Sequence, residues 1–207
     1  MTDDIVIWGI GTPRTLRAYW ALEELGVAYE SRTIRTRTTD MDDPDFLQVS
    51  PGQKIPAMQH GELSITESGA ITRYLMDNFS NENWTAHEQA QTNRWILFSL
   101  MEIDATALYV VRRYRGLPEI YGEAPAAVSS SLEYARRQLN VINEWLSDGR
   151  SFMLGERFSE ADIHVTSCLG WAEVEGIALP EYLSAYRGRL TKRPAYNKAT
   201  TINFPKP

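Results

Sequence analysis

The feature that most constrains the fold is a proline, Pro56, at the point where a short apolar strand should begin. The surrounding segment reads Gln53-Lys54-Ile55-Pro56-Ala57-Met58. Proline cannot donate to a strand ladder, so this position predicts a turn or strand-entry residue, the setting in which cis peptide bonds occur. A cis bond here would turn the backbone outward, and Ile55 would then offer its N–H and C=O to an extended ligand.

A second motif, Ile65-Thr66-Glu67-Ser68-Gly69-Ala70-Ile71, begins nine residues after that proline. It predicts a short strand that gives way to a helix, for which Ser68 is the expected N-cap. Free amides and the positive end of the helix dipole at such a start favour a carboxylate, whereas the adjacent anion of Glu67 favours an ammonium. The pattern therefore predicts recognition of an α-amino acid head group.

Composition limits the partners and the chemistry. The 207 residues are 43% hydrophobic, which is enough to build a core, and the net charge of −6 gives no electrostatic support for binding nucleic acid. The single cysteine, Cys168, excludes an intramolecular disulfide, and the three histidines share no metal-ligand spacing, so we predict no metal. Without a signal-like segment or a long apolar run, we expect a cytoplasmic protein with no membrane insertion.

The first part of the chain alternates strand and helix patterns. A helical pattern that Gly26 should end follows the first strand, and the hairpin signal Gly61-Glu62 separates the last two strands. We expect strands at 5–8, 28–34, 57–60 and 63–66, and helices at 14–25, 44–48 and 69–78. This βαβ order followed by ββα predicts a thioredoxin-like α/β domain over residues 1–82.

The remainder, residues 83–207, predicts an all-α domain after a polar linker at 81–83. Ser159 should cap one helix, with Asp162 reaching back to it as a capping box. The expected helices are 85–114, with a loop from Gly116 to Pro125, then 126–146, the capped helix after Ser159, 180–192 and 194–200. The predicted fold class is therefore α/β plus all-α.

Taken together, the Ile55-Pro56 and Glu67-Ser68 motifs resemble those of the glutathione transferase family. The resemblance extends in family order over most of the chain, through four further blocks: Ile5–Trp8, Trp20–Gly26 with Tyr29-Glu30, Phe158–Asp162 and Leu190–Tyr196. It implies that glutathione is the co-substrate. It places Glu67 and Ser68 on the γ-glutamyl end, the Ile55 main chain beside Pro56 on the cysteinyl unit, and Lys54 with Gln53 near the glycyl carboxylate, where Arg35 and Arg37 could assist.

The implied reaction adds the glutathione thiolate to an electrophile. Lowering a thiol pKa from about 8.5 by about two units needs roughly 2.7 kcal/mol, which one hydroxyl hydrogen bond and a helix N-terminus could supply. The resemblance places Thr12 at the catalytic position, with Thr15 as the alternative and a simple helix cap as the other interpretation of Thr12. Threonines at both positions, where redox relatives keep cysteines, disfavour disulfide chemistry.

The electrophile, expected to be small and hydrophobic, should contact Trp8 and Ile10 together with Tyr109 and Arg113 from the long helix. The resemblance also implies a homodimer, in which Glu102 and Asp104 could reach the partner's ligand. Two other functions stay open: a non-catalytic binding or regulatory protein of this fold, and a glutathione-dependent isomerase or dehalogenase.

Overall fold

The computed structural model describes residues 4–206, which form two compact units. The first comprises the chain up to Asn83 together with the segment from Thr191, and the second runs from Trp84 to Leu190. From the sequence we expect the terminal segment to complete the helical domain. In the structure its helix, α10 (Pro194–Asn203), instead packs in the first unit against helix α1 (Pro13–Leu25). The domain division at residue 82 stays our proposal.

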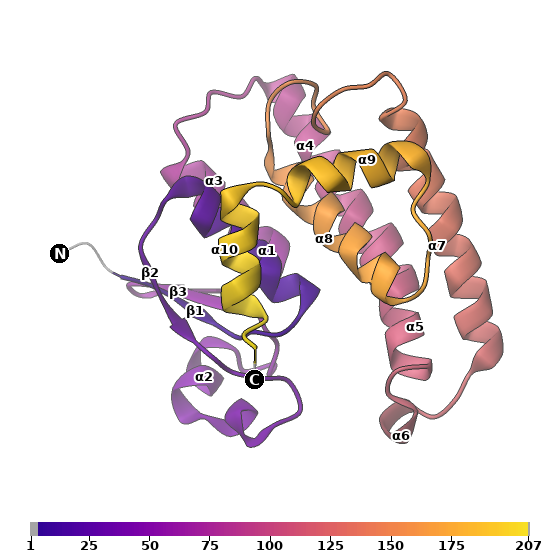
Figure 1. Cartoon of the computed structure of the whole chain (residues 1–207). Helices are drawn as coiled ribbons and strands as arrows, with labels where there is room; N and C mark the ends of the chain where they lie inside the picture. The colour runs from indigo at the N-terminus through magenta and orange to yellow at the C-terminus, as the bar shows by residue number, and fades with distance from the viewer. Residues whose placement is uncertain (1–3, 207) are drawn as a thin grey trace. The chain divides into compact units, whose positions relative to one another are not determined.

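The first unit, whose β1, β2 and β3 are labelled in Figure 1, contains a mixed sheet. The sheet has four strands in the order β2-β1-β3-β4. Strands β1 and β2 are parallel, whereas β1 with β3 and β3 with β4 are antiparallel. Gly61, at φ 58°, makes the tight turn between the last two strands. The strands are β1 (Ile5–Trp8), β2 (Tyr29–Arg32), β3 (Ala57–His60) and β4 (Leu63–Thr66). This topology confirms the thioredoxin-like prediction.

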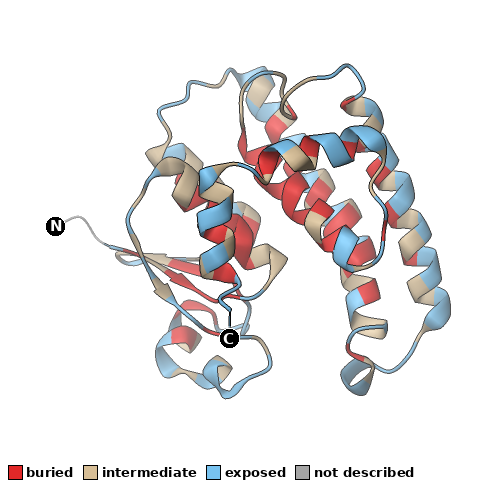
Figure 2. Cartoon of the chain, in the orientation of Figure 1, coloured by how far each residue is buried: buried red, intermediate tan, exposed pale blue. Residues whose placement is uncertain are grey.

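Helix α1 lies at the centre of the first unit. Every residue from Thr15 to Leu22 is buried, and the helix packs against both α3 (Ser68–Phe79) and α10 (Figure 2). It ends, as predicted, at Gly26, whose φ of 64° suits a left-handed C-cap. The predicted polar loop after β2 contains a 3₁₀ turn, Thr39–Asp42, because Thr38 caps it, and helix α2 (Pro44–Val49) follows.

The second unit is helical. Its predicted long helix is continuous through α4 (Ala86–Phe98), a π-helical stretch (Ser99–Leu108) and α5 (Tyr109–Tyr114). Two features differ from expectation: the π-helical stretch itself, and a four-residue helix, α6 (Pro118–Tyr121), within the expected loop. The other helices are α7 (Pro125–Trp145), α8 (Glu160–Val174) and α9 (Glu181–Leu190).

Asp162 organises the core of this second unit. Its buried carboxylate accepts hydrogen bonds from the Ser159 N–H at 2.7 Å, the Ser159 hydroxyl at 2.9 Å, the Met153 N–H at 2.8 Å and the Tyr186 hydroxyl at 2.7 Å. Burial raises the pKa of this carboxyl, although the four donors act in the opposite direction. The capping box predicted from Ser159 and Asp162 is confirmed.

Gly9, directly after β1, permits the closest backbone approach beside the predicted proline turn. Its φ is 105°, and a Cβ at this position would lie 2.4 Å from the Cβ of Ile55. The Gly9 N–H also donates to the Arg32 carbonyl at 2.8 Å, which extends the pairing of the sheet. No side chain fits here without moving either β1 or the Ile55 turn.

Gly9→Ala should therefore destabilise the protein more than Gly26→Ala. Both substitutions put a side chain on a left-handed backbone, at a cost of about 1–2 kcal/mol, but nothing lies within 4 Å of a Cβ at Gly26. The clash with Ile55 should add about 1–3 kcal/mol to the loss for Gly9→Ala. Urea unfolding of the two variants measures the difference, and equal losses would contradict the close approach.

Candidate functional site

The sheet register brings the ends of three strands together. Ala57, the first residue of β3, pairs with Trp8, the last residue of β1, and with Thr66, the last residue of β4. Paired residues in antiparallel strands lie about 5 Å apart. Pro56, Gly9 and Glu67 are each the immediate chain neighbour of one residue in this row, so the three lie close together. The two motifs singled out in the sequence are therefore neighbours in the structure.

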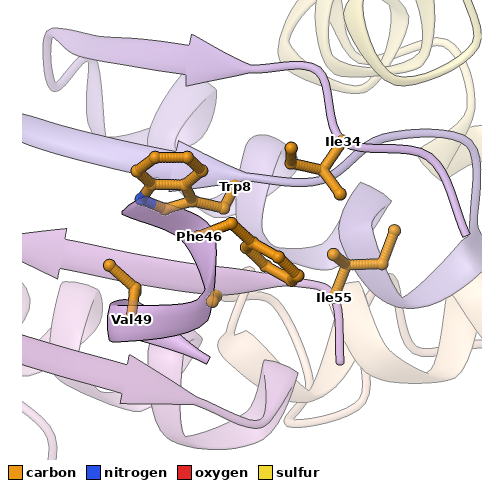
Figure 3. Packing of buried hydrophobic residues seen from close by; sticks show 6 residues of the cluster. Trp8, Ile34, Phe46, Val49 and Ile55 are labelled. Atoms are coloured by element: carbon orange, nitrogen blue, oxygen red, sulfur yellow. The ribbon is translucent and has the colours of Figure 1, made fainter. Parts of the chain in front are cut away.

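The Ile55–Pro56 peptide bond is cis, in agreement with the expected turn. The Ile55 side chain belongs to a buried cluster with Trp8, Ile34, Phe46 and Val49 (Figure 3). Its burial anchors the residue by its side chain, as a main-chain contact with a ligand would require. That contact stays a prediction.

Helix α3 begins one residue earlier than expected. The N-cap is Glu67 rather than Ser68, because the Glu67 carbonyl already accepts the first helical hydrogen bond, from the Ile71 N–H at 3.0 Å. Glu67 has φ 70° and ψ 117°, a costly conformation for a residue with a side chain, and forms no side-chain cap hydrogen bond. The first amides of α3 therefore keep the capacity to bind an anion.

Arg17 joins the starts of α1 and α3. This fully buried side chain donates from Nη1 to the Ser68 hydroxyl at 3.1 Å. The hydrogen bond explains why Ser68 does not serve as the N-cap, since its side chain turns toward α1. Arg17 lies five residues after Thr12, or about 7 Å along the helix axis. The hydrogen bond thus links the first turns of the two helices.

Thr12 is the N-cap of α1, and it forms a reciprocal capping box with Thr15. The Thr12 hydroxyl accepts from the Thr15 N–H at 3.0 Å, and the Thr12 N–H donates to the Thr15 hydroxyl at 3.0 Å. The two hydroxyl oxygens lie 2.9 Å apart. Thr12 is half-buried whereas Thr15 is fully buried, so of the two residues only Thr12 has surface exposed to solvent.

Positive charge lies close to this turn. The Arg35 Nη1 is 3.7 Å from the position that a Cβ on Gly11 would occupy. Together with the positive end of the α1 dipole, this guanidinium favours an anion beside Thr12. The site thus has two anion-favouring helix starts, of which only that of α3 has an acidic side chain, Glu67, at its N-cap.

Gln53 and Lys54 lie on an exposed loop that Ser50 holds in place. The Ser50 hydroxyl donates to the Lys54 carbonyl at 2.9 Å and accepts from the Lys54 N–H at 3.1 Å. The Gln53 amide donates to the Met41 carbonyl at 3.2 Å, and its own backbone is left-handed, at φ 49°. Their predicted role at a carboxylate stays a prediction.

The four residues expected at the electrophile are not brought together by contacts within either unit. Trp8 and Ile10 are 5% and 2% exposed in the first unit, and Trp8 packs on Phe46 with ring centroids 6.0 Å apart. Tyr109 and Arg113 lie half-buried on α5, where the Arg113 guanidinium is 4.5 Å from the Tyr121 ring centroid. Their contact with an electrophile stays a prediction.

Residues 4–206 contain no group of three or more histidine, cysteine, aspartate or glutamate side chains placed to hold a metal ion. Over the same residues, no helix combines the length and the apolar character needed to cross a membrane.

Comparison with known proteins gives two family matches. The model described as "Glutathione S-transferase, N-terminal domain" matches residues 4–77, and "Glutathione S-transferase, C-terminal domain" matches residues 96–194. The chain belongs to the glutathione S-transferase family. The resemblance carried by the Ile55-Pro56 and Glu67-Ser68 motifs is thereby confirmed.

The relatives of this family member include transferases and a protein named for another process. Glutathione S-transferase 4 of Zea mays is 28% identical, over 92% of this chain and 88% of its own. Probable elongation factor 1-gamma 2 of Arabidopsis thaliana is 33% identical over 76% of this chain, which spans only 38% of that protein. The theta class glutathione S-transferase of Xanthomonas axonopodis pv. citri, solved with glutathione bound, has a TM-score of 0.82 at 28% identity, covering 95% and 97% of the two chains.

Sequence reasoning missed three residues that shape this transferase-family site: Gly9, Arg17 and Asn203. Gly9 had a local signal, because a glycine directly after a strand often marks a close backbone approach. Arg17 lies within the predicted first helix, and no local pattern indicates that its side chain is buried against Ser68. The Asn203 side chain contacts the Thr12 turn from 191 residues away, and no local pattern indicates such a contact.

Glu67→Gly should stabilise the unliganded protein. Glycine accepts a φ of 70° without strain, so relief of about 1–3 kcal/mol should exceed the roughly 0.5–1 kcal/mol entropic cost of a glycine. Glu67→Gln, which keeps the strain and removes the charge, should leave the free energy of unfolding unchanged within about 0.5 kcal/mol. Urea unfolding tests both variants, and a glycine variant less stable than the parent would show that Glu67 is unstrained.

Proposed function

We propose that this protein binds glutathione beside Pro56 and adds its thiolate to a small hydrophobic electrophile. The observation that carries the proposal is the convergence of Gly9, the cis Ile55–Pro56 bond and the Glu67–Ser68 helix start at one row of the sheet, with Thr12 three residues beyond Gly9. The relative from Xanthomonas axonopodis, solved with glutathione bound, supports the same ligand. A cytoplasmic setting and the absence of a metal belong to this proposal.

The γ-glutamyl head group would occupy the start of α3. Its carboxylate would take the free amides of the first turn, and its ammonium would face the exposed Glu67 carboxylate. The Lys54 ammonium, on the loop before Pro56, would pair with the glycyl carboxylate at the other end, where Gln53 adds polar contacts. The cysteinyl unit would then lie along the Ile55 main chain.

The two helix starts would hold different parts of this ligand. Arg17 of α1 donates to Ser68 at the start of α3, and Thr12 lies five residues before Arg17 on α1. We place the sulfur of a ligand held at Glu67 and Ser68 beside Thr12. The Thr12 hydroxyl would donate to the sulfur, while the α1 dipole and Arg35 add positive potential.

The electrophile would meet the sulfur on the side toward solvent. Of the four residues predicted to contact it, Tyr109 and Arg113 present surface, and the stacking of Arg113 on Tyr121 would offer a flat, cationic contact to an aromatic or anionic group. A glutathione-dependent isomerase or dehalogenase would use the same thiolate, and product analysis separates these reactions from simple addition.

The second candidate is a binding or regulatory protein without catalysis. One observation favours it: the Thr12 hydroxyl is already engaged as a helix cap, which is sufficient reason for a threonine at this position. The relative named elongation factor 1-gamma also shows that family members carry names other than transferase. Glutathione binding with an unshifted thiol pKa would favour this candidate.

Thr12→Val should raise the pKa of the bound glutathione thiol by about one to two units, because a hydroxyl hydrogen bond to an anion is worth about 1.5–3 kcal/mol. Thr12→Ser keeps the hydroxyl and should hold the pKa within about half a unit of the parent value. Ultraviolet difference absorbance of the thiolate across a pH titration measures both variants. The same pKa in the valine variant and the parent would dismiss this role for Thr12.

We also propose that the protein forms a homodimer through the exposed face of α4 and the π-helical stretch. Leu97 and Met101, about one turn apart there, are 58% and 57% exposed. Burying such side chains against a second copy gains about 1.5–3 kcal/mol each, and twofold symmetry counts each contact twice. Asp104, expected from the sequence to reach the partner, is instead buried in its own unit.

Leu97→Glu combined with Met101→Glu should convert the dimer to a monomer, because four charges would be placed in one apolar interface. Val174→Glu, at an exposed apolar position on α8, is the matched control and should leave the dimer intact. Sedimentation velocity at micromolar concentration distinguishes the species. A parent protein that sediments only as a monomer would refute the proposed dimer.

A further inference from the structure

Asn203, the last residue of α10, clamps the turn that carries Thr12. Its side chain is fully buried and contacts three groups: Oδ1 accepts from the Thr15 hydroxyl at 2.6 Å and from the Gly11 N–H at 3.2 Å, and Nδ2 donates to the Thr12 carbonyl at 2.9 Å. Its own carbonyl also accepts from the Gly11 N–H, at 2.8 Å. One residue thus holds the backbone on both sides of Thr12.

The helix that carries Asn203 is fixed at its other end as well. The Arg193 guanidinium pairs with both oxygens of the Glu24 carboxylate on α1, at 2.6 and 2.7 Å. The Tyr196 ring packs edge-on against Trp20, with centroids 4.9 Å apart. In Figure 1, α10 lies alongside α1. Contacts at both ends of α10 therefore fix the position of Asn203 relative to the start of α1.

Asn203 provides an acceptor for the hydroxyl proton of Thr15. The Thr15 hydroxyl has one proton and two lone pairs, and one lone pair accepts the Thr12 N–H. Its proton has two pure acceptors nearby, Asn203 Oδ1 at 2.6 Å and the Thr12 carbonyl at 2.8 Å. With the proton held there, Thr15 meets the Thr12 hydroxyl, 2.9 Å away, as an acceptor only.

The Thr12 proton then has two destinations. Without a ligand it goes to the neutral Thr15 oxygen, and with a thiolate beside it the anion is the stronger acceptor, since charge-assisted hydrogen bonds are about twice as strong. Buried Thr15 has no second proton to offer. In this network Thr12, and not Thr15, has a hydroxyl proton that can turn to an anion beside it.

We propose that Asn203 is a positioning residue for ionisation of the glutathione thiol. It holds the Thr15 proton and the Gly11–Thr12 backbone so that the Thr12 hydroxyl donates to the glutathione sulfur. This inference rests on the proposed function. It assigns a role in thiol ionisation to the C-terminal helix. It also decides between the two threonines that the sequence left open.

Asn203→Ala should raise the pKa of the bound glutathione thiol by about half to one unit, which lowers the thiolate fraction roughly three- to tenfold at a pH well below the pKa. The isosteric Asn203→Asp loses the donor to the Thr12 carbonyl and adds an anion, so it should raise the same pKa at least as much. Asn197→Ala is the control on the same helix and should leave the pKa unchanged. The Asn197 side chain is exposed and donates only to the Arg193 carbonyl.

A double-mutant cycle separates positioning from a merely structural role. If Asn203 acts through Thr12, then Asn203→Ala in a Thr12→Val background should add nothing to the pKa shift of Thr12→Val alone. Thermal unfolding of each variant reports any loss of stability, which a structural role would produce without moving the pKa. Should the alanine variant not fold, the aspartate variant takes its place in the cycle, and only the part of its pKa shift that disappears in the Thr12→Val background reports positioning.

The outcomes distinguish this inference from the function on which it rests. Calorimetry that detects no glutathione binding to the parent protein overturns both. If the parent binds glutathione and lowers its thiol pKa below that of free glutathione, but the Asn203 variants show the same pKa as the parent, only the positioning role is overturned. Additive shifts in the double mutant would also overturn it, because Asn203 would then act independently of Thr12.

Discussion

The pairing of Ala57 with both Trp8 and Thr66 is the constraint on which the candidate site depends. It places the ends of β1 and β4 on either side of the start of β3, so three turns meet at one edge of the sheet. A shift of one residue in either ladder would move the Ile55–Pro56 bond away from the start of α3 and turn each side chain to the other face. The approach of Gly9 to Ile55 holds this register, because neither strand can slide without a collision.

The two helices that start at this edge, α1 and α3, have different N-terminal caps, and the difference suits the two ends of one ligand. The start of α1 is closed by the Thr12–Thr15 capping box, which leaves one half-buried hydroxyl beside a positive dipole. The start of α3 has no side-chain cap and retains a strained, exposed acid. The first arrangement suits a single anionic atom, and the second suits a group with both charges. The Arg17 contact with Ser68 links the two helices near these starts.

Much of the fold was predictable because its signals are local. Gly26 and Gly61 end a helix and a hairpin through their own backbone preferences, and the capping box of Ser159 and Asp162 lies within four consecutive residues. The π-helical stretch was not predictable, because its apolar residues fit an α-helical period equally well and only packing selects the wider turn. The N-cap of α3 was misplaced by one residue, since the deciding partner of Ser68 is Arg17, on another helix.

The sequence by itself determined which residue types are available at the site: a proline that enters a strand, an acid and a serine that start a helix, and a threonine at the head of another. Only the tertiary structure decided how they act, because their roles depend on partners far along the chain. Trp8 packs on Phe46 of α2 within the buried cluster of its unit, and its predicted contact with an electrophile stays a prediction. The last helix lies on α1 because Arg193 pairs with Glu24, and Asn203 thereby reaches the Thr12 turn. Hydrogen bonds between residues nearly 200 positions apart leave no periodic trace in a sequence, since they require only that two surfaces meet once the chain has folded.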